Sequence, residues 1–395
     1  MCDGLEEVGM RLLHTSDWHL GRTLFQTSLL AEQGRFLAWL LDTAREQRVD
    51  AVLVSGDVYD RAVPPLEAVA LLDSAFEAFS EADIPLVVVS GNHDSAVRLG
   101  FGSGLAERAG VHLRTTLDDL ARPVLLADEH GPVAVYGLPF LLPDAVKDRL
   151  HAERSHESVL RAAVAQILAD SEQRGVGRTV VLSHAFVVGG APSESERDLA
   201  VGGIGDAPAA VFDGITYVAL GHLHRPQEIS LPGSTTRLRY SGSPLAFSFG
   251  EKHDTKSVVV IELDAAGVSS VDTLPTPVPR PMREVRGRLD ELLALDDPEL
   301  ARSWIKAVIT DPSRPVSPME RLRERWPHTL VLEFAPDVDR VSSDDDMARL
   351  RRTTDPVEIA TMFVEYVDTL PPTPDEAALL ARAVETVRDV EVAAG

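Results

Sequence analysis

The chain has 395 residues, of which 44% are apolar, and this length exceeds one ordinary hydrophobic core, so two or more domains are expected. Its formal net charge of −24 is unusual for a protein that contacts nucleic acid, because phosphate binding normally requires a basic surface. The single cysteine excludes an internal disulfide, and no run approaches the roughly 18 consecutive apolar residues that span a bilayer.

Residues 1–9 are acidic and lack the basic and apolar regions of a signal peptide, so a disordered extension on a cytoplasmic protein is expected. Strands and helices then alternate, which is typical of βαβ units and a sheet that is parallel at least in part. Apolar runs and helical spacing predict strands at 10–15, 51–55 and 86–90 and helices at 29–47 and 65–81.

Further apolar runs follow residue 110. Those at Val87–Val89 and Val180–Leu182 are continuous rather than alternating, as in strands covered on both faces, so helices are expected on both sides of the sheet. A helix is predicted at 157–172. The remaining strands are predicted at 111–114, 123–127, 133–138, 178–183, 215–220, 238–240 and 257–263.

Proline occupies every second position from Pro275 to Pro281, which is typical of an extended linker. The main domain is therefore predicted at 10–275. A small capping domain is expected at 276–340, a polar linker at 341–354 and a helical hairpin at 355–392.

The hairpin has a doubled helix-start signal, because Asp355-Pro356 and Thr373-Pro374 each place proline after a capping residue and glutamate three residues after the cap. Each helix has one apolar face, which could dock on a partner coiled coil or pack within the protein. The two faces consist of Ile359, Met362, Phe363 and Tyr366, and of Ala377, Leu380, Val384 and Val387.

Five turns that follow apolar strands carry residues of the types that bind metal ions. Because the carboxyl ends of parallel strands meet at one edge of a sheet, these side chains are expected to lie together. A single Asp-x-His or lone His is usually structural, so the five are stronger evidence together than singly. They are Asp17-Trp18-His19, Gly56-Asp57, Gly91-Asn92-His93-Asp94, Ser183-His184 and Gly221-His222-Leu223-His224.

Three carboxylate or amide oxygens and four imidazoles suit Mn²⁺, Fe²⁺ or Zn²⁺ better than Mg²⁺. Seven ligands are too many for one ion, whereas two ions about 3.5–4 Å apart would use them all and leave room for water and a phosphate. Asp57 would bridge the two ions. One ion would bind Asp17, His19, Asp57 and His224, and the other Asp57, Asn92, His184 and His222.

Such a pair suits phosphate-ester hydrolysis, because it lowers the pKa of a bridging water and neutralises charge in the transition state. His93 directly follows a ligand, so it is expected to point elsewhere and to act on the leaving oxygen or a phosphate oxygen. Asp94 could orient His93. The alternative, a degenerate site without metal, is disfavoured because no ligand type is missing.

The motif order D-x-H, GD-x-x-D, GNHD, a lone His and GHxH resembles the calcineurin-like metallophosphoesterases, whose metal roles match these positions one by one. The openings at 14–21 and 91–95, with 219–224 and 240–244, resemble the bacterial Mre-type DNA repair nucleases within that superfamily. The resemblance is specific over 10–275. It implies an α/β fold with mixed β-sheets and helices on both outer faces, followed by a small α+β capping domain and C-terminal helices.

The resemblance further implies a Mn²⁺-dependent exonuclease on duplex ends and endonuclease on hairpins and single strands, in DNA repair and recombination. Its implied partners are an ABC-type ATPase with a long coiled coil and a second copy of the chain. Asp60 stands where some relatives carry His, so no catalytic role is transferred to it.

The acidic charge is unevenly distributed. Residues 281–330 contain nine Lys or Arg and nine acids, so this segment is the best candidate for a DNA-facing cap, although a solvated surface is the plain alternative. Two other functions remain open, a stand-alone phosphodiesterase or phosphatase and a non-catalytic scaffold for the ATPase.

Overall fold

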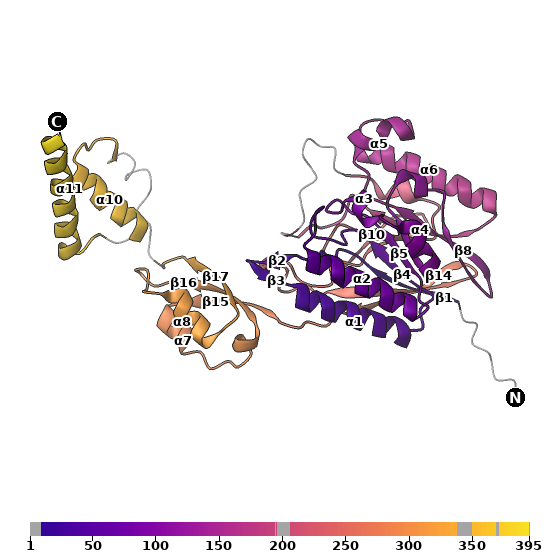
Figure 1. Ribbon diagram of the computed structural model, residues 1–395, viewed down its shortest axis with the longest axis horizontal. Coiled ribbons are helices and arrows are strands. Elements are labelled where there is room, and N and C mark those ends of the chain that lie inside the picture. The colour runs from indigo at the N-terminus through magenta and orange to yellow at the C-terminus, as the bar shows by residue number, and fades with distance from the viewer. Residues whose placement is uncertain (1–8, 194, 196–205, 338–349, 369–370, 395) are drawn as a thin grey trace. The chain divides into compact units, whose positions relative to one another are not determined.

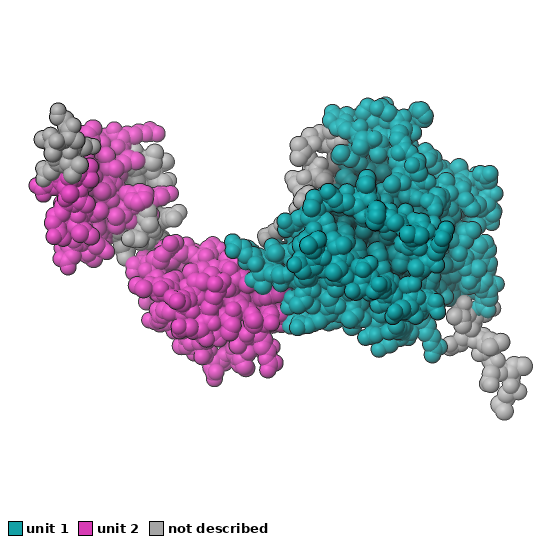
Figure 2. Space-filling model, in the orientation of Figure 1, with its two compact units in different colours: residues 1–279 teal, residues 280–395 magenta. Residues whose placement is uncertain are grey.

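The computed structural model describes residues 9–193, 195, 206–337, 350–368 and 371–394 (Figure 1). The chain divides into two compact units, Met1–Pro279 and Arg280–Gly395 (Figure 2). Nearly all of the predicted extension at 1–9 and most of the predicted linker at 341–354 lie outside the described residues. Among the described helices, none combines the length and the apolar character that crossing a membrane requires.

The first unit contains two six-stranded sheets. In the first, the strand order is β14-β13-β1-β4-β5-β6. Its members β1, β4, β5 and β6 are parallel, whereas β13 and β14 pair antiparallel. These strands are β1 (Met10–Thr15), β4 (Ala51–Ser55), β5 (Leu86–Val89), β6 (Val111–Arg114), β13 (Ser257–Asp264) and β14 (Gly267–Pro275).

The second sheet has the order β11-β12-β10-β9-β8-β7. Here β8, β9, β10 and β12 are parallel, and the edge strands β7 and β11 are antiparallel to their neighbours. The strands are β7 (Val124–Asp128), β8 (Gly131–Leu138), β9 (Arg178–His184), β10 (Tyr217–Gly221), β11 (Gln227–Ile229) and β12 (Arg237–Tyr240).

Helices cover one face of each sheet (Figure 1). Helices α1 (Leu30–Glu46) and α2 (Leu66–Glu81) pack on the first sheet, and α6 (His156–Arg174), preceded by α5 (Pro143–Leu150), packs on the second. A third apolar core lies between the two sheets. The predicted α/β class, with mixed sheets and helices on the outer faces, is confirmed.

The reason for the continuous apolar runs differs from the one expected. Val88 packs toward the helices, whereas Val87 and Val180 belong to the core between the sheets. Successive residues of a strand point to opposite faces, so each run is apolar throughout because one face meets helices and the other meets the second sheet. The expectation of helices on both sides of a single sheet was wrong.

Short elements connect these layers. A two-stranded hairpin, β2 (Thr23–Leu24) and β3 (Thr27–Ser28), precedes α1. The short helices α3 (Ala96–Leu99) and α4 (Ser103–Ala106) follow β5. Arg98 of α3 donates from Nη1 to the carbonyl of Ala62, 2.9 Å away, and so ties this segment to the loop before α2.

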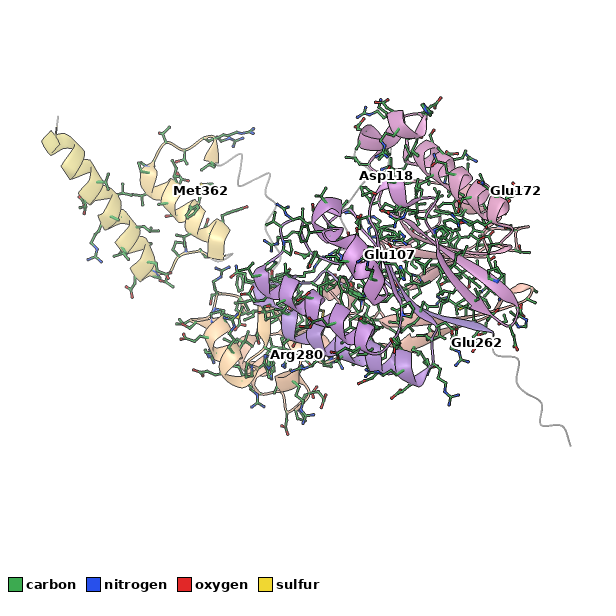
Figure 3. The ribbon with its side chains drawn as sticks, turned by 45° about the vertical axis from the view of Figure 1, so that its right-hand side comes forward. Glu107, Asp118, Glu172, Glu262, Arg280 and Met362 are labelled. Carbon is green, nitrogen blue, oxygen red and sulfur yellow. The ribbon has the colours of Figure 1, made fainter. Side chains whose placement is uncertain are left out.

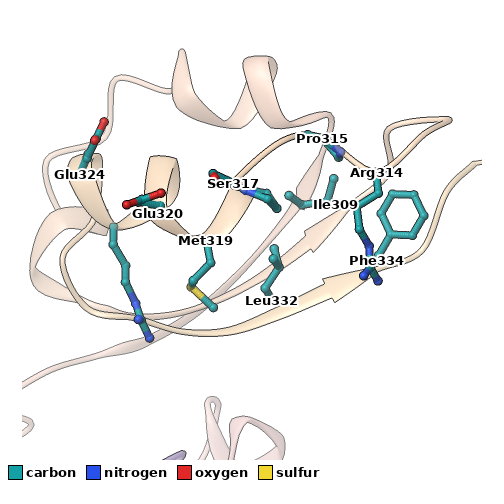
Figure 4. Close-up of a pocket in the computed structure, with 11 residues that line it drawn as sticks. Ile309, Arg314, Pro315, Ser317, Met319, Glu320, Glu324, Leu332 and Phe334 are labelled. Atoms are coloured by element: carbon teal, nitrogen blue, oxygen red, sulfur yellow. The ribbon is translucent and has the colours of Figure 1, made fainter. Parts of the chain in front are cut away.

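The second unit begins with a three-stranded parallel sheet, β15 (Met282–Gly287), β16 (Trp304–Ile309) and β17 (Thr329–Phe334), in that order. Helices α7 (Leu289–Leu293) and α8 (Pro318–Arg325) share its core with Ile305 and Trp326. A groove of about 810 Å³ opens beside α8 and β17, lined in part by Met319, Leu332 and Phe334 (Figure 4). None of its lining residues belongs to the predicted metal site.

Two further helices, α10 (Pro356–Asp368) and α11 (Pro374–Ala394), begin at the prolines that the sequence marks as helix starts. The amide of Val357 donates to the side chain of Asp355, and Thr373 and Glu376 bond each other reciprocally. The helices pack against each other, with Met362 of α10 buried (Figure 3).

Candidate metal centre

The predicted site residues follow the carboxyl ends of five parallel strands. Strands β1, β4 and β5 of the first sheet lead to Asp17, Asp57 and Asn92, whereas β9 and β10 of the second end at His184 and just before His222. The two sheets meet there, since the amide of His222 donates to Asp17, 3.0 Å from Oδ1. The site is therefore built across the edge shared by both sheets.

The backbone of this site is unusual. Asp17, His19, Asp57 and His222 all have positive φ, between 46° and 108°, although none is glycine. Such conformations cost of order 1–3 kcal/mol each and cluster at functional sites. The surrounding hydrogen bonds hold them, as where the amide of His19 donates to the carbonyl of Asp57 at 2.9 Å.

Two glycines let the turns approach closely. A Cβ on Gly91 would lie 2.1 Å from Oδ1 of Asp57, and a Cβ on Gly221 would lie 1.8 Å from the carbonyl oxygen of Ser55. Both distances are far shorter than van der Waals contact, so only glycine fits. The glycines of the GNHD and GHxH motifs thus have a steric reason.

The first group of site residues surrounds His19. Its Nε2 lies 3.1 Å from Nε2 of His224 and 3.6 Å from Oδ2 of Asp57. Asp17 belongs to the same group, since ligand atoms of Asp17, His19 and His224 lie within 4.8 Å of one another. All of these side chains are buried.

The second group surrounds Asn92. Its Oδ1 lies 2.9 Å from Nε2 of His184 and 3.1 Å from Nδ1 of His222. Oδ2 of Asp57 lies 3.6 Å from Nε2 of His184, the same distance that separates this oxygen from His19. The structure thus brings all seven predicted ligands together, with Asp57 between the two groups.

Burial keeps the imidazoles of the site neutral. It lowers the pKa of His19 and of His184 to about 3, and it lowers the pKa of His222 and His224 well below the usual value. Neutral imidazole is the form that binds metal ions. Nδ1 of His184 donates to the carbonyl of Ser55 at 2.9 Å, so its Nε2 presents a lone pair toward Asn92 and Asp57.

The donor set fits divalent metal ions. Nε2 of His19 and Nε2 of His224 face each other in a buried place, where both rings are neutral, and a carboxylate completes each group. Converging lone pairs and carboxylate oxygens repel one another without a cation, so a divalent ion would stabilise the arrangement. The assignment of each residue to an ion stays a prediction.

His93 lies beside the site with its own hydrogen bonds. Its amide donates to Oδ1 of Asp57 at 2.8 Å, and its Nδ1 donates to the carbonyl of Asp60 at 2.7 Å. Its Nε2 lies 3.9 Å from Oδ2 of Asp57. His93 is also close enough to His19 and Asp57 that these three could share an ion, so its role needs a direct test.

Asp94 makes different contacts from those expected. Its carboxylate accepts hydrogen bonds from the amides of Val58, Tyr59 and Gly91, at 2.8–3.1 Å, and the structure gives it no hydrogen bond to the ring of His93. Burial, together with the charge of Asp57, raises the pKa of Asp94. Asp94 therefore clamps the loop after β4 to the loop after β5, and the carbonyl of Asp60 orients His93 in its place.

Sequence reasoning missed three neighbours of the site. The carboxylate of Asp60 lies 3.6 Å from Nδ1 of His19 and 3.5 Å from the guanidinium of Arg22. The ring of Phe247 packs on both His19 and His224, and the guanidinium of Arg22 lies 4.6 Å from the centre of that ring. Asp60 was visible in the GD-x-x-D motif, but Arg22 and Phe247 carry no local spacing signal.

The Tyr240-Ser241-Gly242-Ser243 turn lies behind the ligands. Oγ of Ser16 is 2.6 Å from Oδ2 of Asp17 and 2.8 Å from Oγ of Ser241. The amide of Ser243 donates to the carbonyl of His224 at 3.1 Å. The turn thus supports two ligand-bearing loops through hydrogen bonds.

Comparison with known families gives two matches. A family model described as calcineurin-like phosphoesterase matches residues 10–226. A second, described as the Type 5 capsule protein repressor C-terminal domain, matches residues 278–368, which comprise the three-stranded sheet of the second unit and α10. The two matches divide the chain close to the boundary between its compact units.

Curated relatives match most of the chain. A protein named as the SbcD component of the nuclease SbcCD, from Staphylococcus saprophyticus subsp. saprophyticus, is 29% identical over 82% of this chain and 84% of its own. A protein of the same name from Staphylococcus epidermidis is 28% identical over 82% of this chain and 85% of its own. Among solved structures, the calcineurin-like phosphoesterase YfkN from Bacillus subtilis is 16% identical, covers 68% of this chain and 90% of its own, and has a TM-score of 0.40.

Proposed function

Because the chain belongs to the calcineurin-like phosphoesterase family, we propose that it is the nuclease subunit of an SbcCD-type complex and hydrolyses DNA phosphodiesters with two divalent metal ions. One observation carries the chemistry. A single oxygen, Oδ2 of Asp57, lies 3.6 Å from a histidine of each ligand group, which is the place of a shared ligand. The relatives' name supports the substrate and the complex.

The ions, when bound, would neutralise phosphate charge and activate a water molecule for attack on phosphorus. The chain's own residues do the rest. Neutral, buried imidazoles and the carboxylates of Asp17 and Asp57 would hold the ions, and Mn²⁺ suits this mixed donor set. His93 keeps Nε2 available, since its Nδ1 donates to a carbonyl, and would donate a proton to the leaving oxygen.

A nuclease assay with Mn²⁺ tests this function. Linear duplex, hairpin and single-stranded DNA are offered to the protein with and without an SbcC-type ABC ATPase that carries a coiled coil. We expect cleavage of single strands and hairpins, and of duplex ends when the ATPase is present. Cleavage of bis(p-nitrophenyl) phosphate but of none of the DNA substrates would instead indicate a stand-alone phosphodiesterase, and no cleavage with metal bound would indicate a scaffold.

The net charge of −24 bears on how DNA is bound. Several cations of the predicted DNA-facing cap are paired with acids of the same unit, namely Arg286 with Asp337, Lys306 with Glu333 and Arg321 with Asp290. Paired surface charges attract phosphate weakly. We therefore infer that the partner ATPase supplies much of the affinity for duplex DNA, with the cap at 276–340 in a secondary role.

The C-terminal helices are the proposed contact with that ATPase. Phe363 and Tyr366 of α10 are 65% and 70% exposed, although Met362 beside them is buried against α11. Mutual packing of the two helices thus leaves an apolar face uncovered within the part of the chain that the structure describes. Such a face suits a helix-on-coil contact.

Truncation after residue 352 tests this contact. Metal content and Mn²⁺-dependent cleavage of single-stranded DNA should persist, because all seven predicted ligands belong to the first unit. Co-purification with the SbcC-type ATPase should fall sharply. The double variant Phe363→Ser/Tyr366→Ser should weaken it in the same direction with the helices intact. Undiminished association of the truncated protein would place the docking surface elsewhere.

A homodimer is the second proposed assembly. The start of α2 and the α3–α4 segment expose large apolar side chains, and Arg98 ties these two segments together. A self-complementary apolar face of this kind suits a two-fold contact between copies of the chain. The α2–α4 apolar face consists of Val63, Leu66, Val69, Val97, Phe101 and Leu105, exposed by 42–89%.

Light scattering during gel filtration tests the dimer. The wild-type protein should have the mass of two chains, and Leu66→Glu/Phe101→Glu should have the mass of one, because each charge would be buried at the contact. Leu125→Glu is the control, since Leu125 is 54% exposed on β7, away from this face. A wild-type monomer, or a dimer that survives the double substitution, would contradict the assignment.

A further inference from the structure

A buried ion pair lies behind the first ligand group. Lys256 and Glu251 have side chains only 4% and 0% exposed, and Nζ of Lys256 lies 2.5 Å from Oε2 of Glu251. The same ammonium donates to the carbonyl of His224 at 2.8 Å and to Oγ of Ser243 at 3.1 Å. All three ammonium hydrogens thus have acceptors, one of which is the backbone of a predicted ligand.

The acidic partner reaches the same group by another route. Glu251 accepts a hydrogen bond from the amide of Phe247 at 3.3 Å, and from Oγ of Ser248 at 3.0 Å. The ring of Phe247 packs edge-on against the rings of His19 and His224, with centroids 5.3 and 5.4 Å away. One ion pair therefore holds the backbone of His224 and the aromatic wall beside both imidazoles.

We propose that Lys256 and Glu251 are positioning residues that fix His224 and Phe247 for the metal ion bound by Asp17, His19, Asp57 and His224. This inference rests on the proposed two-metal function. Neither residue carries a recognisable motif, and neither touches the predicted ligand atoms. Their contribution is to hold the imidazole of His224 in one place, as hydrogen-bonded groups behind metal ligands commonly do.

The chain contains a matched pair that lacks this connection. Arg178 and Asp128 form a similarly buried ion pair, with side chains 8% and 7% exposed. Asp128 also accepts from the amide of Met10, and Arg178 donates to the carbonyls of Gly131 and Asp264. These contacts lie at the amino ends of β1, β8 and β9, opposite the candidate site.

The test replaces each pair by neutral residues of similar shape. Lys256→Met/Glu251→Gln leaves no unpaired buried charge, and the carboxamide introduced by Glu251→Gln would keep an acceptor for the amide of Phe247. Arg178→Met/Asp128→Asn is the control. Manganese binding to each full-length protein is followed by electron paramagnetic resonance, which counts bound Mn²⁺ and yields the two dissociation constants without any turnover.

Both double variants should lose thermal stability, but only the Lys256/Glu251 variant should bind one of its two Mn²⁺ ions about 10–100-fold more weakly, with the other unchanged. Unchanged constants in that variant, or equal weakening in both variants, would overturn the inference. A wild-type chain that binds fewer than two Mn²⁺ ions would overturn the proposed function itself, and this inference with it.

A milder substitution covers the case in which the double variant does not fold. Phe247→Leu keeps an apolar side chain and leaves the ion pair intact, but it removes the ring that packs on His19 and His224. It should weaken the same Mn²⁺ position by a smaller factor. Binding constants equal to those of the wild type would contradict the proposed role of the wall that Glu251 holds.

Discussion

Asp57→Ala is expected to lose both metal ions and to reduce Mn²⁺-dependent DNA cleavage by about 10³-fold or more, while the protein stays folded. The reason is that one carboxylate faces both ligand groups. Metal ions stabilise transition-state charge by several kcal/mol, and about 4 kcal/mol corresponds to a factor of roughly 10³. Metal analysis after gel filtration and a nuclease assay measure both effects.

The fold should survive because the substitution has opposing effects on stability. The amide of His93 loses its acceptor, at a cost of about 1–3 kcal/mol, but the buried negative charge near Asp94 disappears. Asp57→Asn is the control, since its side-chain oxygen can still accept from that amide without carrying charge. Circular dichroism reports the fold of both variants. Two bound ions and full activity in Asp57→Ala would exclude a shared ligand.

His93→Ala is expected to keep both metal ions and to lower kcat for DNA by about 10²–10⁴-fold, the usual contribution of a proton donor. Its Nδ1 donates to the carbonyl of Asp60, so the ring is held beside the ligands by the protein alone. The leaving oxygen of DNA departs as a poor leaving group that needs a proton. A nitrophenyl ester leaves as a stable anion, and its cleavage should therefore suffer far less.

Metal analysis separates the two roles open to His93, which also lies within reach of an ion shared with His19 and Asp57. A large loss of metal in His93→Ala would make it a ligand. Equal loss of activity on DNA and on the nitrophenyl ester would rule out proton donation to the leaving group. His112→Ala, at a half-buried histidine paired with Glu107, is the control and should cleave both substrates normally.

Most strands of the first unit could be predicted because they are apolar runs bounded by turns, as at Ala51–Ser55. Strand β14 was missed because most of its side chains are exposed and its alternation is weak. The division into two sheets was missed for another reason. Apolar periodicity shows that both faces of a strand are covered, but it does not show whether a helix or a second sheet covers them.

The candidate ligands could be predicted because each directly follows a strand, so local sequence predicts its place. The supporting residues could not. Lys256 contacts His224 and Ser243, which are distant in sequence, and Phe247 reaches His19 from the opposite end of the domain. Asp94 was assigned to the wrong neighbour, because adjacency to His93 in sequence does not determine which backbone amides its carboxylate reaches.

Anomalous diffraction from a crystal of the protein grown with Mn²⁺ tests the two-metal site most directly. The account predicts two manganese peaks about 3.5–4 Å apart, with the carboxylate of Asp57 bound to both. His19 and His224 should bind one ion, and His184 and His222 the other. A single peak, or two peaks of which only one touches Asp57, would contradict it.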